Sequence, residues 1–496
     1  MSTDRRTPAA TELVVDVGRV AHGGHAVARH EGRVIFVRHG IPGEKVRIRL
    51  TDDAEGAKFW RGDVIEVLEA SEDRVEHFWH AADARRAWAH GHPPVGGAEL
   101  GHISLPRQRR LKAEVLAEQL HRLAGIDAHA LAGLPGAGHV EAVGEDATSG
   151  APGLGWRTRT GFAMTPSGQL GMHAYRADTV LAVREMPLAV DGINDLRLWD
   201  HDLQGIERIE VAAPANGSRP LVLLVPAPGT RPQRVAAIAA RFPETVSVAR
   251  LDPATGEVTQ LRGRTWVQET AAGHDFRVTG DGFWQIHRHA PETLVGAVKE
   301  ALHDGGYLAP GSAVADLYAG AGLFTAALAD AVGVTGSVLS VEGSPGTSRD
   351  ARKNLHHAPQ VEIVQGKVER VLRQKPRSFD ALILDPPRAG AGKAVVSQLV
   401  DSAPRAIAYV SCDPASFARD VGYFQQRGWA LKSLRGFDLY PHTHHLETVA
   451  LLTPGARATR MGGVVRRRAG SAPRFPTVPR RTSRSGPSRP ACPAAG

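Results

Sequence analysis

The sequence predicts an α/β protein whose last domain is a doubly wound, largely parallel sheet. From residue 276 onward, short apolar runs alternate with stretches of helical periodicity, which is the pattern of such a sheet. Glycine, acidic or cysteine residues follow directly on several of these apolar runs. Before this domain, closely spaced strand-like runs predict a small β-barrel of the oligonucleotide-binding (OB) type, followed by a mixed α+β central domain.

Length and composition set the broad class of the protein. A chain of 496 residues is long enough for two or three domains with their own cores. Its two cysteines, Cys412 and Cys492, cannot build a disulfide framework, so a reducing cytosol is expected. No apolar run approaches the roughly 18 residues of a membrane span, and the polar start does not resemble a signal peptide. We expect a cytoplasmic monomer without membrane contact.

The net charge of +8 is unevenly distributed. Residues 455–496 hold ten arginines and no acidic residue, so removing their +10 leaves the body of the chain near −2. This tail lacks the apolar content needed to fold, and we expect it to be disordered, like residues 1–11. It is either a nonspecific phosphate-binding arm or a solvated extension.

The barrel is expected over residues 12–72, with strands at 13–17, 33–37, 46–50 and 62–68. Glycine-containing turns separate these runs. Basic residues alternate with the apolar ones, which favours an RNA-binding surface over an ordinary solvated face. The candidate RNA-binding residues are Arg33, Arg38, Lys45 and Arg47.

The central domain is expected over residues 73–275 and the last domain over 276–454. A helix is predicted within 109–123 from the spacing of its apolar residues. In the last domain, strands are predicted at 314–318, 337–341, 361–364, 381–384, 407–410 and 448–452, and helices at 291–303 and 393–403. Ligands of a doubly wound sheet bind at the carboxyl ends of its strands.

Glycines close the first of these strands. Gly320 and Gly322 follow Tyr318, at a strand-to-helix turn where a ligand can approach the backbone closely. Glu342 ends the next strand, where a carboxylate is suited to hold ribose hydroxyls. The third glycine of a dinucleotide fingerprint is missing, so an adenosyl cofactor without a pyrophosphate, S-adenosylmethionine, fits better.

Cys412 stands in the segment Ser411-Cys412-Asp413-Pro414, directly after an apolar strand. This position is that of a nucleophile rather than of a buried small hydrophobe. The fifth carbon of uracil is a poor nucleophile until a thiolate adds to the sixth carbon, and a base must later remove the proton from the fifth carbon. Cys412 and Glu447 would supply the nucleophile and the base, and the site should activate the thiol.

Several segments in order make the resemblance to a family specific. The chain resembles the S-adenosylmethionine-dependent RNA (uracil-5-)-methyltransferases, which make 5-methyluridine in tRNA or 23S rRNA, over about residues 12–453. Residues 32–37 and 41–44 are similar to the TRAM domain of many members. The segments that carry the resemblance in the last domain are Phe283-Trp284-Gln285, 316–322, 341–342, 385–390, 411–414 and 441–447.

The resemblance implies a Rossmann-like class I methyltransferase domain and roles for individual residues. It implies that Cys412 is the nucleophile and Glu447 the proton acceptor. It implies cofactor contacts from Gln285, Tyr318, Glu342 and Asp385, besides Gly320 and Gly322. Members usually carry Asn where this chain has His287, which puts that contact in doubt, and Asp413 replaces a more frequent Asn. One branch of the family holds an iron–sulfur cluster on four cysteines, which a chain with two cysteines cannot build, so we expect no cluster and no other metal.

Other functions remain open at this point. The nearest enzymatic alternative is an RNA cytosine-5-methyltransferase, whose cysteine is placed differently. The Asp385-Pro386-Pro387 segment alone would also suit an amino-methyltransferase, which lacks the nucleophile. From another class, the chain could be an RNA-binding or RNA-folding protein whose methyltransferase activity is dispensable. The TRAM-like barrel favours 23S rRNA over tRNA as the substrate.

Overall fold

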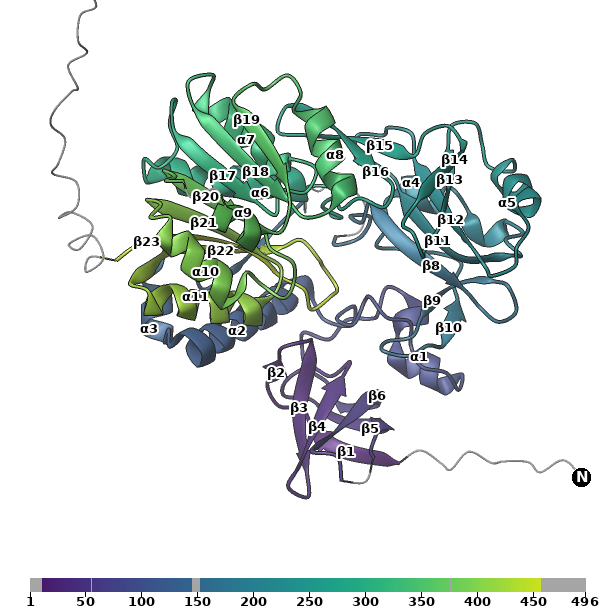
Figure 1. Ribbon diagram of the computed structural model, residues 1–496. Helices are drawn as coiled ribbons and strands as arrows, with labels where there is room; N and C mark the ends of the chain where they lie inside the picture. Colours follow the sequence, from purple (N-terminus) through teal and green to yellow (C-terminus); the bar gives the residue numbers. More distant parts are fainter. Residues whose placement is uncertain (1–10, 55, 145–151, 375–376, 456–496) are drawn as a thin grey trace, which may run out of the picture. The chain divides into compact units, whose positions relative to one another are not determined.

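The computed structural model describes residues 11–54, 56–144, 152–374 and 377–455. Except for Thr11 and Gly455, the predicted N-terminal segment and the arginine-rich tail lie outside these residues. The described strands form sheets of six, seven, two and eight strands (Figure 1). Across the described stretches, every helix falls short of the length or the apolarity that a bilayer span requires.

The six-stranded sheet confirms the strands predicted for the N-terminal domain. The alternation of apolar and basic residues explains why these segments form strands. In β5, Val46, Ile48 and Leu50 are buried in the core of this sheet, while the intervening basic residues face the other side. Glu31 and Gly32, both with positive φ, make the tight turn between β3 and β4. The strands, in the order β1-β5-β6-β4-β3-β2, are β1 (Glu12–Asp16), β2 (Val20–Ala21), β3 (His25–His30), β4 (Arg33–Arg38), β5 (Lys45–Asp52) and β6 (Phe59–Glu69).

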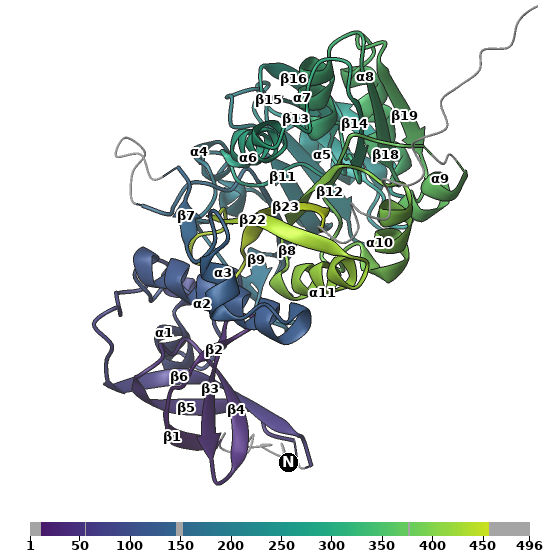
Figure 2. The ribbon, with the colours of Figure 1, turned by 90° about the vertical axis from the view of Figure 1, so that its left-hand side faces the viewer.

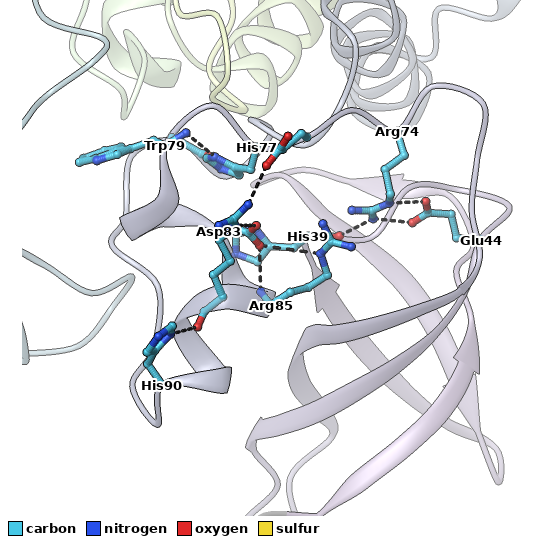
Figure 3. Close-up of polar contacts among 11 residues, drawn as sticks. His39, Glu44, Arg74, His77, Trp79, Asp83, Arg85 and His90 are labelled. Carbon is cyan, nitrogen blue, oxygen red and sulfur yellow. Dashed lines mark hydrogen bonds and ion pairs between the residues drawn. The ribbon is translucent and has the colours of Figure 1, made fainter.

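The chain that leaves this sheet is bound back to it by buried polar contacts. The Arg74 guanidinium donates to both carboxylate oxygens of Glu44, at 2.6 Å each, and to the carbonyl oxygen of His39 at 2.8 Å (Figure 3). Further along, the ring of His77 is held by the backbone of Trp79 and Ala98. Two short helices follow in this segment, η1 (His80–Ala82) and α1 (Ala84–Ala89).

Helix α2 (Leu105–Ala124) confirms the predicted helix at 109–123. A proline in its first turn and the left-handed Gly125 after its last turn explain where it begins and ends. Its apolar side packs beside α11 (Pro414–Gln426), as Figures 1 and 2 both show. After α3 (Ala128–Ala132), strand β7 (Val140–Ala142) joins the edge of the eight-stranded sheet. Part of the segment assigned to the central domain therefore packs with the last domain.

The seven-stranded sheet has the order β10-β9-β8-β11-β12-β13-β14 and its own apolar core. Only its β12–β13 pair is parallel. The strands are β8 (Arg159–Met164), β9 (Leu170–His173), β10 (Val180–Ala182), β11 (Ile206–Ala212), β12 (Leu221–Pro226), β13 (Ser247–Leu251) and β14 (Val258–Arg262). Three short helices accompany them, α4 (Asp191–Asn194), η2 (Leu198–Asp200) and α5 (Pro232–Ala239), and a hairpin of β15 (Trp266–Ala271) and β16 (His274–Thr279) follows.

The eight-stranded sheet confirms the predicted α/β fold, in the order β19-β18-β17-β20-β21-β23-β22-β7. The pairs from β19 to β21 are parallel, and β23 runs antiparallel between β21 and β22. All six predicted strands are present: β17 (Ala313–Leu317), β18 (Ser337–Glu342), β19 (Val361–Gln365), β20 (Ala381–Leu384), β21 (Ala406–Ser411) and β23 (Glu447–Pro454). The long strand β22 (Trp429–Asp438) was not predicted.

Helices cover this sheet on both faces because its strands are apolar on both. Val314, Ile383 and Ala408 share one core with α6 (Ala290–Asp304) and α7 (Leu323–Val332), which include the predicted helix at 291–303. The alternate residues Leu382 and Ile407 share the opposite core with α2, α9 (Val368–Gln374), α10 (Gly392–Asp401) and α11. Helix α8 (Pro345–Asn354) follows β18. This layering leaves the carboxyl ends of the parallel strands as the edge where side chains meet a ligand.

Candidate active site

The turn after β17 is shaped for close approach by a ligand. Tyr318, Gly320 and Gly322 all have positive φ, at 67°, 56° and 96°. A side chain at Gly322 would collide with Leu355, because an added Cβ would lie 2.8 Å from its Cδ1. At Gly320 no atom lies within 4 Å of an added Cβ, so the backbone there faces open space. The predicted glycines therefore have distinct roles, one in packing and one beside a free space.

Glu342, at the end of β18, is fixed beside this turn. One carboxylate oxygen accepts the backbone N–H of Gly320 at 2.8 Å, and the other accepts the N–H of Ser344 at 2.6 Å. Each oxygen keeps a further lone pair for a ligand hydroxyl. The structure thus brings together three residues predicted to bind the cofactor, Tyr318, Gly320 and Glu342.

Two carboxyl groups, the buried Asp316 and the half-buried Asp385, lie at the carboxyl ends of β17 and β20. Burial raises the pKa of Asp316 to about 7, and it does the same for Asp385, whose pKa the nearby Asp316 raises further. The Thr325 hydroxyl donates to one oxygen of Asp316, while its other oxygen is buried without a hydrogen-bond partner among the described residues. An unpartnered carboxylate oxygen next to a second acid is a place that favours a cationic ligand. Asp316 was not assigned a role from sequence, although an acid inside an apolar strand was a usable signal.

A first prediction concerns the pH dependence of stability at Asp316. Because its pKa is raised, the folded chain holds a proton that the unfolded chain releases between about pH 4 and pH 7, so stability falls across this window as the pH rises. Asp316→Asn removes this loss. We expect the melting temperature of Asp316→Asn minus that of the unchanged protein to be more positive at pH 8 than at pH 4. A pH-independent effect of Asp316→Asn would contradict the raised pKa.

Strand pairing brings Cys412 and Glu447 to the same end of the sheet. Strands β21 and β23 pair antiparallel, and the last residue pair of their ladder is Ser411 with Thr448. The next residue beyond Ser411 is Cys412, and Glu447 directly precedes Thr448. The side chain of Thr448 also donates to the carbonyl oxygen of Ser411 at 3.1 Å, which fixes this end of the ladder.

The surroundings of Glu447 favour its neutral form. Its side chain is buried, and burial together with the negative charge of Asp385 raises its pKa well above the usual range. The hydroxyl of Tyr440 donates to one of its oxygens at 3.2 Å and partly opposes this shift. Tyr440 was not predicted as a site residue, and it orients the carboxyl group.

The loop between β22 and β23 that carries Tyr440 is held from α2. The ammonium of Lys112 pairs with Asp438 at 2.5 Å and donates to the carbonyl oxygen of Tyr440 at 3.0 Å. Gln108 accepts the backbone N–H of His442 at 2.7 Å. Across the described residues, no group of three or more histidine, cysteine, aspartate or glutamate side chains is arranged to hold a metal ion.

The surroundings of Cys412 do not activate its thiol, contrary to expectation. Burial, followed by the charges of Glu447 and Asp385, raises its pKa to about 12, and the guanidinium of Arg388 only partly opposes this. The sequence could not reveal the burial of the thiol, which is the largest cause of this shift, because burial depends on tertiary packing.

A second prediction follows for the reactivity of this thiol. Because its pKa is raised to about 12, the thiolate fraction of Cys412 at pH 8 should be about 10³-fold below that of free cysteine. Labelling by iodoacetamide requires the thiolate. We expect iodoacetamide to label the Cys412 peptide correspondingly slowly, as measured by mass spectrometry against free cysteine in the same tube. Labelling at the rate of free cysteine would show that the pKa of the thiol is not raised.

Asp413 connects the segment that carries Cys412 to the N-terminal sheet. Its carboxylate caps α11 by accepting the N–H of Ser416 at 2.8 Å, and it pairs with the His22 ring at 3.2 Å. Although burial opposes it, the hydrogen bonds from His22 and Ser416 lower the pKa of Asp413 to about 2. The hydrogen bond to Asp413 also raises the pKa of His22. Where the resemblance to the family leads one to expect asparagine, this chain thus has an aspartate whose negative charge is stabilised by the ring of His22.

The predicted RNA-binding arginines make contacts within the N-terminal region. Arg38 forms an ion pair with Asp63 at 2.6 Å, and Arg47 pairs with Glu66 at 2.8 Å. Arg33 donates to the carbonyl oxygen of Ala57 and lies over a tryptophan ring. These three residues and Lys45 do not line the cavity beside Cys412, and their contact with RNA stays a prediction.

The remaining residues considered for cofactor contact, Gln285 and His287, follow β16 and are both buried. The ring of His287 stacks on Trp156 at 5.6 Å, and burial lowers its pKa to about 3. A neutral imidazole therefore stands where family members usually carry asparagine.

Taken together, the doubly wound sheet, its glycine turn and the acid at the end of β18 define a methyltransferase. Comparison with known proteins identifies the family. Residues 367–454 match the family model described as tRNA (Uracil-5-)-methyltransferase, and residues 10–65 match the TRAM domain. A relative in Streptomyces avermitilis, named an "Uncharacterized RNA methyltransferase", is 42% identical over 90% of this chain and 99% of its own length. A second relative, also named an "Uncharacterized RNA methyltransferase", in Bifidobacterium longum, is 36% identical over 91% of this chain and 99% of its own length.

The chain therefore belongs to the TRAM-containing RNA (uracil-5-)-methyltransferase family. Among solved structures, the tRNA (uracil-54, C5)-methyltransferase of Pyrococcus abyssi, in complex with S-adenosyl-L-homocysteine, has a TM-score of 0.63 and 20% identity. The match covers 88% of this chain and 100% of that one, and it confirms the fold.

Proposed function

We propose that this chain transfers a methyl group from S-adenosylmethionine to C5 of a uridine in 23S rRNA, through a covalent bond between Cys412 and C6. The observation that carries the proposal is the meeting of Cys412 and Glu447 at the last pair of the β21–β23 ladder. A cysteine nucleophile and a separate base are what C5 chemistry on uracil requires. Amino-methyltransferases need neither.

The residues at the ends of β17, β18 and β20 fit the proposed cofactor. The carboxylate of Glu342, oriented by two backbone N–H groups, would hold the ribose hydroxyls. The unpartnered oxygen of Asp316 and the carboxyl of Asp385 favour a cationic ligand, and S-adenosylmethionine carries both a sulfonium and an ammonium. Gln285, Tyr318, Gly320 and Gly322 complete the proposed site. When bound, the cofactor supplies the electrophilic methyl group.

The chain's own groups would act in three steps. First, the Cys412 thiol gives its proton to solvent and the sulfur bonds to C6 of the uracil, while the electron pair of the C5–C6 π bond moves onto C5 and the neighbouring carbonyl oxygen. Second, after C5 has gained its methyl group, Glu447, which has by then lost its own proton to solvent, accepts the proton that C5 still carries. Third, the electron pair of that C–H bond restores the C5–C6 double bond and the sulfur leaves as thiolate. A carboxyl group whose raised pKa stabilises its protonated form is suited to hold the proton from C5.

Access to the reacting base would require the uridine to leave its stack. The TRAM domain supports 23S rRNA as the proposed substrate, because by the family resemblance this domain is more usual in rRNA-acting than in tRNA-acting members. We further propose that the enzyme acts in the cytoplasm as a monomer.

The direct test uses purified protein, labelled S-adenosylmethionine and transcripts of 23S rRNA and of tRNA. We expect label in 5-methyluridine after digestion, from 23S rRNA and not from tRNA. Label in 5-methyluridine from tRNA alone would keep the chemistry and change the substrate. Label in 5-methylcytidine or in an N-methylated base would overturn the uracil assignment.

A further inference from the structure

A cavity of about 300 Å³ opens directly beside Cys412, and residues from distant parts of the chain line it. The N-terminal sheet contributes Phe36 and Arg61, and the turn after β9 contributes Arg176. The loop after β20 contributes Arg388, and a further wall is formed by residues 412–414 and 444–445. Three of these stretches thus each bring one arginine to the cavity beside Cys412. The volume is at the lower end of the range for ligand sites.

The contacts between the N-terminal sheet and the nucleophile segment define this cavity. His22, before the turn that leads into β3, pairs with Asp413 at 3.2 Å. In the same turn, Gly24 approaches the Cβ of His444 so closely that an added side chain would lie 2.6 Å from it. The TRAM domain is therefore one wall of the active-site cavity.

The charge of this cavity is positive. Arg176 and Arg388 have exposed guanidinium groups, and neither has a carboxylate partner among the described residues. Arg61 pairs with Asp52 at 2.5 Å through one nitrogen, which leaves its other donors for a ligand. The one acid of the lining, Asp413, is already paired with His22. Guanidinium groups recognise phosphate by paired hydrogen bonds as well as by charge.

An aromatic surface adjoins these arginines. The half-buried ring of Phe36 is fixed by edge contacts with His25, at 6.0 Å between ring centres, and with Phe59, at 5.1 Å. Arg176 lies over the ring of Tyr175 at 5.4 Å, with a φ of 51°. Proteins that bind single-stranded RNA combine such cationic grooves with aromatic rings on which bases stack.

We propose that Arg61, Arg176 and Arg388 form a phosphate-binding subsite for the nucleotide next to the target uridine, with Phe36 as the stacking surface for its base. The inference rests on the proposed function, since it places the reacting uridine at Cys412. It gives the TRAM domain a defined task, which is to hold the strand on one side of the extruded uridine. The residues that do so differ from the basic residues of β4 and β5 that the sequence indicated.

The test measures RNA binding as a function of salt. The probe is an oligoribonucleotide that spans the methylated uridine, and the variants are Arg176→Gln and Arg61→Gln in the full chain. Each should weaken binding severalfold at 0.1 M NaCl and lower the slope of log K against log salt by about 0.7, because one phosphate contact is lost. The matched controls are Arg184→Gln and Arg29→Gln, which remove exposed arginines outside the cavity and should leave the Kd and the slope unchanged.

The conservative variant Arg176→Lys separates charge from structure. It should keep the salt slope and lose only part of the affinity, because lysine supplies the charge without the paired hydrogen bonds. Methylation by Arg176→Gln should show a raised KM for RNA with a smaller change in kcat.

Two failures can be told apart in this experiment. If the unchanged protein methylates the uridine while Arg176→Gln and Arg61→Gln bind it with unchanged affinity and slope, the phosphate subsite is wrong and the proposed function stands. If the variants lower kcat but not affinity, the cavity holds the reacting base itself, and the subsite is again wrong. If the unchanged protein methylates no uridine in RNA, the proposed function fails.

Discussion

Replacing Cys412 with alanine should abolish methyl transfer to RNA. In the proposed mechanism the thiol of Cys412, directly after β21 and beside Glu447, forms the bond to C6, and alanine has no group that can form it. We expect kcat/KM to fall by at least about 10⁴-fold, which corresponds to about 5.5 kcal/mol of transition-state stabilisation. The measurement is incorporation of labelled methyl groups into RNA.

The same variant decides whether methylation is the chain's cellular role. Alanine leaves the half-buried position of Cys412 filled by a small side chain, so thermal unfolding should change little, and RNA affinity should be kept. If Cys412→Ala lost activity but restored growth or ribosome assembly to cells that lack the gene, an RNA-folding role would be favoured. Near-normal turnover by Cys412→Ala would remove the nucleophile assignment.

The second large effect is expected from Glu447→Gln. Glutamine keeps the size of the side chain and an oxygen that can accept the Tyr440 hydroxyl, but it cannot take the C5 proton. The methylated adduct should therefore form and then release slowly, by a factor of about 10² to 10⁴. A protein–RNA adduct should be visible on a denaturing gel, with the added mass on the peptide that contains Cys412.

A double variant supplies the control for this adduct. Glu447→Gln combined with Cys412→Ala should form none, because the sulfur that bonds to C6 is gone. Normal turnover by Glu447→Gln without a trapped adduct would exclude Glu447 from the mechanism. Because the carboxyl group is buried with a raised pKa, its neutral replacement should not destabilise the fold at pH 8.

Much of the fold could be predicted because the last domain is periodic. Its six predicted strands are mostly apolar, as strands covered by helices must be, and they stand out from the helices between them. Strand β22 was missed because its pattern is broken by Lys432 and Arg435, and its pairing with β23 is interrupted between Leu431 and Ser433. Strand β7 has only three residues and gains its place by pairing with β22.

Several candidate site residues could be predicted from their places at strand ends. Cys412, Glu342 and Asp385 were predicted in this way, because the carboxyl ends of parallel strands meet. The burial of Cys412, followed by the charges of its acidic neighbours, raises the pKa of its thiol, and both depend on tertiary packing that no local pattern reveals. The cavity residues Arg61 and Arg176 come from stretches far from Cys412 in sequence, so only tertiary packing brings them to it.

The central claim, that this chain methylates C5 of uridine in RNA through Cys412, is tested most directly in cells. The measurement is nucleoside mass spectrometry with site mapping on 23S rRNA and tRNA, from cells with the gene, without it, and with the Cys412→Ala form. The proposed mechanism predicts loss of 5-methyluridine from one position in 23S rRNA, restored by the unchanged gene and not by Cys412→Ala. Unchanged 5-methyluridine in both RNA pools, with loss of a different methylated base, would contradict it.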